Sequence, residues 1–157
     1  GAHLVLEGET FDEAFTVAQA IAAKEELVVI HPFDGPVVMA GQGTVGIEML
    51  EDDPSLEVLV VPVGGGGLIA GIATAARHLS PGIEIVGEQS GLDAGMAAHL
   101  GMAARGGAGG PTVAEGIAVR EPGQLSRGGH VAVRSCPACR RSSRRAPTVD
   151  EIEAGCA

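Results

Sequence analysis

The feature that most constrains this sequence is a run of four consecutive glycines between an apolar segment and a segment with helical spacing. Residues 58–63 are almost wholly apolar, residues 64–67 are all glycine, and residues 68–79 have a helical character. An uninterrupted apolar run of this length is typical of a strand that is buried on both faces of a parallel sheet. The pattern predicts a strand, a glycine loop and a helix in immediate succession.

A glycine loop at the start of a helix can bind an anion. The first backbone N–H groups of a helix have no partner within the helix, and the helix dipole places partial positive charge at the same end. Glycines allow the backbone to approach an anion closely. The alternative is a tight turn without a ligand, but four glycines cost about 0.5–1 kcal/mol each relative to alanine. The loop is therefore predicted to bind a phosphate group.

The local pattern leaves open which phosphate compound binds. Gly65, Gly67 and Gly71 form a G-x-G-x-x-x-G pattern, and Glu88 follows about twenty residues later, as in a dinucleotide-binding unit. The unbroken run of glycines differs from the spaced glycines of such units. A Walker loop is excluded because no Gly-Lys-Ser/Thr follows the glycines.

The rest of the chain up to about residue 102 alternates between strand and helix patterns. Thr10 and Glu13 have the spacing of a capping box, which predicts a helix that begins after Thr10. Further strands are expected at 3–6, 27–30 and 83–86, and further helices at 41–50 and 92–102. This order predicts an α/β fold with a mostly parallel sheet flanked by helices.

Composition narrows the possible partners. The formal net charge is −10, which argues against nucleic acid, whose phosphates require lysine and arginine. No apolar run is long enough to cross a membrane, so no membrane association is expected. Three cysteines without a secretory signal favour a reducing, cytoplasmic location over a disulfide-rich secreted protein.

Several motifs in order resemble the threonine/serine dehydratase family, which includes the serine racemases. The motifs are His31-Pro32-Phe33-Asp34, Ala40-Gly41-Gln42-Gly43-Thr44, Pro62 to Ala73 across the glycine loop, and Thr112 to Val119. The resemblance covers residues 1–126. It implies the large domain of a fold-type II pyridoxal-phosphate enzyme, present here in part, and a parent enzyme that is a homo-oligomer.

The resemblance also implies a site and an activity. Gly64, Gly65, Gly66, Gly67 and Leu68 would bind the phosphate of pyridoxal 5'-phosphate through their backbone N–H groups. Gly116 would lie against the cofactor ring, next to Glu115, where the family usually has aspartate. The activity would be an ammonia-lyase reaction, in which L-threonine or L-serine loses ammonia by α,β-elimination and yields a 2-oxo acid.

This chain departs from the family pattern because its only lysine, Lys24, lies outside every motif. The family's Schiff-base lysine, in a Ser-x-Lys-x-Arg-Gly setting, is expected before Gly1. We therefore assign no catalytic residue and expect a fragment that is inactive alone. Neither do we assign a metal site, since Glu88 is a single carboxylate. The alternatives are a serine racemase-like enzyme, a dinucleotide-binding domain and a non-catalytic remnant.

Residues 127–157 differ in composition from the rest of the chain. Six arginines and no acidic residue lie between Pro122 and Val149, and neither a strand nor a helix period survives there. Cys136 and Cys139 have C-x-x-C spacing without the second pair that a zinc site needs. The segment is interpreted as a disordered tail or the product of a shifted reading frame, with weak regular character returning at 148–154.

Overall fold

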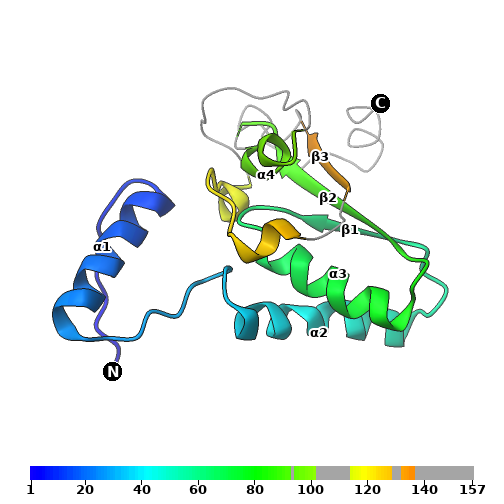
Figure 1. Ribbon diagram of the computed structural model, residues 1–157, viewed down its shortest axis with the longest axis horizontal. Helices are drawn as coiled ribbons and strands as arrows, with labels where there is room; N and C mark the ends of the chain where they lie inside the picture. The colour runs from blue at the N-terminus through cyan, green and yellow to red at the C-terminus, as the bar shows by residue number, and fades with distance from the viewer. Residues whose placement is uncertain (93, 102–113, 129–131, 137–157) are drawn as a thin grey trace. The chain divides into compact units, whose positions relative to one another are not determined.

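The computed structural model describes residues 1–92, 94–101, 114–128 and 132–136 (Figure 1). Contacts between Cα atoms divide the chain into two compact units, Gly1–His31 and Pro32–Ala157, which are described separately. Among the described residues, no helix combines the length and the hydropathy needed to cross a bilayer.

The first unit is built on helix α1 (Phe11–Glu25), which begins where the sequence predicts. The Thr10 side chain accepts a hydrogen bond from the Glu13 backbone N–H at 3.3 Å, which is one half of the capping box. The Glu13 carboxylate accepts from the N–H of Glu9 at 2.8 Å, one residue before the expected donor. Glu26, in the left-handed region with φ 55°, ends the helix.

The strands predicted at 3–6 and 27–30 do not form, and both segments are irregular. Several of their apolar side chains are exposed, for example Leu4 at 76% and Val28 at 87%. A strand is stabilised by hydrogen bonds to a neighbouring strand. The described part of this unit provides no such neighbour, so the apolar pattern alone does not produce a sheet.

The second unit contains a parallel sheet in the order β1-β2-β3. Its strands are β1 (Val58–Pro62), β2 (Glu84–Ser90) and β3 (Ala132–Cys136). Helix α3 (Gly67–Leu79) connects β1 to β2, as expected of a crossover between parallel strands. The predicted α/β arrangement of strand, glycine loop, helix and strand is therefore confirmed.

Strand β3 was not expected, because it lies in the segment whose composition suggested no regular structure. It pairs with β2 in register, with Val86 opposite Ala132 and Ser90 opposite Cys136. The prediction of irregular structure is wrong for these five residues, since pairing with a neighbouring strand overrides a weak local pattern. The possible regular segment at 148–154 lies outside the described residues.

The remaining elements are α2 (Pro36–Asp52), α4 (Gly95–His99) and the short 3-10 helices η1 (Glu115–Ile117) and η2 (Leu125–Gly128). Helix α2 begins five residues earlier than predicted, with Pro36 in its first turn, where proline needs no backbone N–H. Helix α4 is shorter than the predicted segment 92–102. Helices α2 and α3 run side by side (Figure 1).

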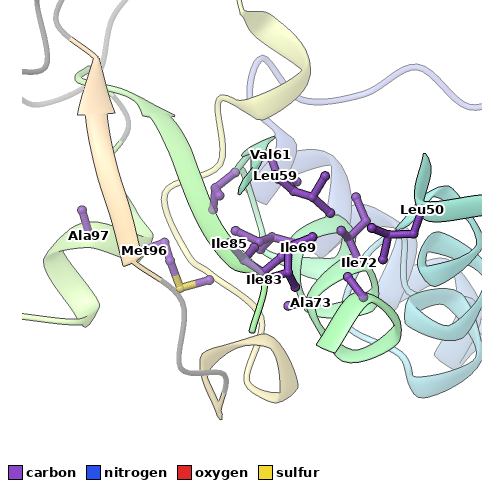
Figure 2. Packing of buried hydrophobic residues seen from close by; sticks show 12 residues of the cluster. Leu50, Leu59, Val61, Ile69, Ile72, Ala73, Ile83, Ile85, Met96 and Ala97 are labelled. Atoms are coloured by element: carbon purple, nitrogen blue, oxygen red, sulfur yellow. The ribbon is translucent and has the colours of Figure 1, made fainter. Parts of the chain in front are cut away.

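The core lies between the sheet and the helices, and it is built from aliphatic side chains (Figure 2). Leu59 and Val61 in β1 are 2% and 3% exposed, whereas Val60 between them is 62% exposed. Side chains in a strand alternate between its two faces. One face of β1 therefore packs into the core and the other is largely exposed, so the prediction of a strand buried on both faces is wrong for β1, which lies at the edge of the sheet. This core fixes the end of β1, where the glycine loop begins.

Candidate functional site

The glycine loop follows directly on the carboxyl end of β1. The Val63 backbone N–H donates to the carbonyl oxygen of Glu88 at 2.7 Å, which continues the pairing with β2 by one residue. Gly66 is the residue before α3 and has φ 97°, a left-handed conformation that glycine adopts without a steric penalty. The chain can thus turn from strand into helix within the four residues between β1 and α3.

The loop presents five consecutive backbone N–H groups that have no acceptor in the described parts of the chain. They belong to Gly64, Gly65, Gly66, Gly67 and Leu68, the residues that the sequence analysis singled out. Gly65, Gly66 and Gly67 are also buried. A buried polar group without a partner costs about 1–3 kcal/mol. An anion at the start of α3 would satisfy these donors and would also meet the positive end of the helix dipole.

The glycines themselves are required by packing within the protein. A Cβ atom on Gly65 would lie 2.3 Å from the ring of Phe33, and one on Gly67 would lie 2.3 Å from the carbonyl oxygen of Phe33. A Cβ atom on Gly66 would lie 2.5 Å from Cε of Met96. The sequence pattern predicts that the glycines allow an anion to approach. The structure gives a different reason for them, so an anion site is supported only by the N–H groups that have no acceptor among the described residues.

A second segment, Gly123 to Ser126, supports the loop through the carbonyl oxygen of Gly65. This oxygen accepts from the N–H of Gly123 at 2.9 Å and from the hydroxyl of Ser126 at 2.8 Å. The Asp34 carboxylate in turn accepts from the N–H groups of Gln124 at 2.8 Å and Leu125 at 2.9 Å. These contacts join residues up to 91 positions apart, and no sequence pattern indicated them.

Gly116 lies in η1, which the fold brings next to the glycine loop. A Cβ atom on Gly64 would lie 3.0 Å from Cα of Ile117, the next residue after Gly116. Among the described residues, a Cβ atom on Gly116 would meet no atom within 4 Å. Gly116 therefore lies beside the loop, and within the described part of the chain the absence of its side chain leaves room for a flat group.

The geometry does not favour a dinucleotide site. In such units the third glycine allows close packing of the helix on the strand. A Cβ atom on Gly71 would instead lie 2.2 Å from the carbonyl oxygen of Met39 in α2, so this glycine serves the contact between two helices. Glu88 lies within β2, opposite Pro62 of β1, and two further residues of the strand follow it.

The other candidates for chemistry are a lysine, a metal site and a cavity. Lys24 is exposed in the last turn of α1, in the first unit. No group of three or more His, Cys, Asp or Glu residues that could hold a metal ion is found in the described residues. A cavity of about 600 Å³ is lined by α2, α3, α4 and η2, and its lining is mostly apolar and contains none of the five N–H groups.

Comparisons with known proteins agree on one group of enzymes. The family model described as "Pyridoxal-phosphate dependent enzyme" matches residues 1–157. The L-threonine ammonia-lyase of Thermotoga maritima is 48% identical over 128 residues, which are 80% of this chain and 32% of that protein. The processed form of threonine deaminase isoform 2 from Solanum lycopersicum matches with a TM-score of 0.68 and 39% identity, over 78% of this chain and 36% of that one.

A racemase also matches in structure. Maize serine racemase gives a TM-score of 0.68 and 29% identity, over 85% of this chain and 44% of its own. This chain spans about a third of the length of the curated relatives that it matches.

Proposed function

Because this chain belongs to the family of pyridoxal-phosphate dependent enzymes, we propose that its glycine loop binds the phosphate group of pyridoxal 5'-phosphate. The observation that carries the proposal is the row of backbone N–H groups from Gly64 to Leu68 at the start of α3, for which the described part of the chain provides no acceptor. A phosphate group has several acceptor oxygens and a negative charge. It therefore matches both the donors and the helix dipole without a basic side chain.

The ring of the cofactor is assigned to the space beside Gly116. This assignment is supported by the position of η1 next to the loop and by the open space at the Gly116 Cα. When bound, pyridoxal phosphate supplies a ring that accepts electrons from the substrate. The residues described here bind the phosphate and leave room for the ring. None of them is proposed to transfer a proton.

For the full-length enzyme we infer the release of ammonia from L-threonine or L-serine. The inference is supported by the relatives named L-threonine ammonia-lyase, at 48% and 47% identity. We propose that the 157-residue chain is a fragment without this activity, since its single lysine lies outside the motifs of the family. We also propose a cytoplasmic location, which is supported by the low number of cysteines, three in 157 residues. We propose that residues 1–126 belong to the cofactor-binding fold together with strand β3, because β3 pairs with β2. The remainder of 127–157 is proposed as a tail of atypical composition.

Racemisation of serine is the second candidate, supported by the match to maize serine racemase. The two activities give different products from L-serine, namely a 2-oxo acid with ammonia in one case and D-serine in the other. Assay of the full-length enzyme for both products would separate them. Accumulation of D-serine without ammonia would favour the racemase.

Equilibrium dialysis of the purified chain tests the proposed cofactor site. Pyridoxal phosphate should bind with one-to-one stoichiometry, and inorganic phosphate should displace it, because both compete for the same N–H groups. Pyridoxal, which has no phosphate, should bind much more weakly. If NADH bound and displaced pyridoxal phosphate, or if pyridoxal bound as well as its phosphate ester, the proposed site would be wrong.

A further inference from the structure

We propose that Asp34 is a positioning residue, which orients the glycine loop for phosphate binding without touching the phosphate. The proposal rests on the proposed function, since it concerns the same loop. Asp34 lies outside the five residues assigned to the phosphate. Its carboxylate acts on the loop through the segment from Gly123 to Ser126.

The first step is the contact between Asp34 and that segment. Its two carboxylate oxygens accept from two successive backbone N–H groups, those of Gln124 at 2.8 Å and Leu125 at 2.9 Å. Hydrogen bonds to a charged acceptor are stronger than those between neutral groups. Gly123 allows this close approach, because a Cβ atom there would lie 2.4 Å from Oδ1 of Asp34. The carboxylate therefore fixes the start of η2.

The second step joins this segment to the glycine loop. The carbonyl oxygen of Gly65 accepts from the Gly123 N–H at 2.9 Å and from the Ser126 hydroxyl at 2.8 Å. The same hydroxyl lies 3.0 Å from the carbonyl oxygen of Gly123, so its hydrogen is shared between two acceptors. Ser126 is 8% exposed, and water does not readily replace these bonds. Both donors stand next to the N–H groups that Asp34 holds.

The third step follows from the geometry of the peptide bond. A peptide unit is planar and trans, so its carbonyl oxygen and its N–H point in opposite directions. When the Gly65 carbonyl is held toward Gly123 and Ser126, the N–H of Gly66 in the same unit points away from them. Gly66 lies among the five free donors. Asp34 thus sets the direction of a donor that it does not contact.

A substitution at Asp34 separates this role from a simple charge effect, because the two predict opposite changes in the affinity for phosphate. Removal of a negative charge near an anion site strengthens anion binding on electrostatic grounds. Loss of orientation weakens it. The N–H groups of Gln124 and Leu125 belong to exposed residues and can bond to water instead, so the variant is expected to fold.

The experiment compares Asp34→Ala with Asp53→Ala in the full 157-residue chain. Asp53 also accepts two hydrogen bonds, from the N–H of Ser55 at 2.9 Å and its hydroxyl at 2.6 Å, at the end of α2. Inorganic phosphate is titrated while the backbone amide resonances are followed, and urea unfolding is measured alongside. We expect Asp34→Ala to weaken phosphate binding by about ten-fold. Asp34→Asn keeps one acceptor oxygen and should weaken it less. Asp53→Ala should leave phosphate binding unchanged.

The outcomes distinguish this proposal from the proposed function. If the wild-type chain shifts the amides from Gly64 to Leu68 and Asp34→Ala binds phosphate equally well or more tightly, the positioning role is wrong and the phosphate site stands. Equal weakening in both alanine variants, in proportion to lost stability, would also refute it. If the wild-type chain binds no phosphate, the proposed function fails and the positioning role fails with it.

Discussion

Substitution of alanine at Gly71 and at Gly41 tests how α2 and α3 are packed. Both glycines lie inside helices, Gly41 in α2 and Gly71 in α3. Alanine is favoured over glycine in a helix by about 1 kcal/mol, and this gain is common to both variants. A Cβ atom at Gly41 meets no atom of the described residues within 4 Å. Gly41→Ala is therefore expected to stabilise the chain by about 1 kcal/mol.

At Gly71 the new Cβ atom would lie 2.2 Å from the carbonyl oxygen of Met39 and 2.8 Å from the backbone nitrogen of Gly43. Ordinary contact distances between such atoms begin near 3.4 Å. Both neighbours belong to the backbone of α2, so the helices must separate by about 1 Å, which is of the order of the shifts that overpacked cores undergo. Overpacking of this kind typically costs about 1–3 kcal/mol, and the upper end is expected where a backbone is blocked.

The assay is urea unfolding followed by circular dichroism. The difference in unfolding free energy between Gly41→Ala and Gly71→Ala isolates the steric cost, since the propensity gain cancels, and we expect about 3 kcal/mol. An unchanged dependence on urea would show that the comparison is between similar folded states. If Gly71→Ala were as stable as Gly41→Ala, Gly71 would not hold α2 against α3. The dinucleotide reading of Gly65, Gly67 and Gly71 would then regain its support.

Three further predictions concern single side chains. Gly116→Leu is expected to keep the unfolding free energy and the affinity for inorganic phosphate, because the new Cβ meets no described neighbour. It should weaken the binding of pyridoxal phosphate in dialysis, because the leucine side chain would crowd the ring. Equal affinity for the cofactor would contradict the assigned ring position. Borohydride treatment with pyridoxal phosphate and peptide mapping should find no stoichiometric label at Lys24, whereas a full label there with deaminase activity would overturn the view of this chain as inactive. Hydrogen bonds from Ser55, mainly from its hydroxyl and to a lesser extent from its N–H, lower the pKa of Asp53 below its usual 3.8. The ionised Asp53 therefore contributes to stability above pH 3.8, and this contribution is lost as the pH falls through the lowered pKa. In Ser55→Ala, an NMR titration should show the Asp53 pKa closer to 3.8, and an unchanged pKa would refute this cause.

The family and the α/β fold class could be predicted from the sequence, and both are confirmed. The capping pattern at Thr10 predicts the start of α1, the apolar run at 58–63 predicts β1, and the helical spacing after the glycines predicts α3. Helix α2 was placed five residues too late, although Pro36 is a common first-turn residue. Strand β3 and the missing strands at 3–6 and 27–30 depend on partner strands, which a local pattern does not reveal.

The sequence predicts which backbone N–H groups form the candidate site, but it does not predict the contacts that hold them in place. The position of Gly64 to Leu68 between a strand and a helix follows from the sequence. The first N–H groups of any helix also have no acceptor within that helix. Phe33 packs against the loop from about 30 residues away, and Ser126 bonds to Gly65 across 61 residues. Asp34 does not contact the loop, and it bonds to Gln124 across 90 residues. No sequence periodicity indicates that such segments lie together, so only the folded structure shows which neighbour leaves no room for a side chain at each glycine.

Amide chemical shifts during a titration with pyridoxal phosphate show directly which residues bind its phosphate group. We expect the largest shifts at Gly64, Gly65, Gly66, Gly67 and Leu68. Inorganic phosphate should shift the same amides, and only the cofactor should also shift Gly116. This result would show that the phosphate group of the cofactor accepts hydrogen bonds from the N–H groups of the loop. Saturable binding of pyridoxal phosphate that left these five amides unmoved, with shifts gathered elsewhere in the chain, would contradict the account.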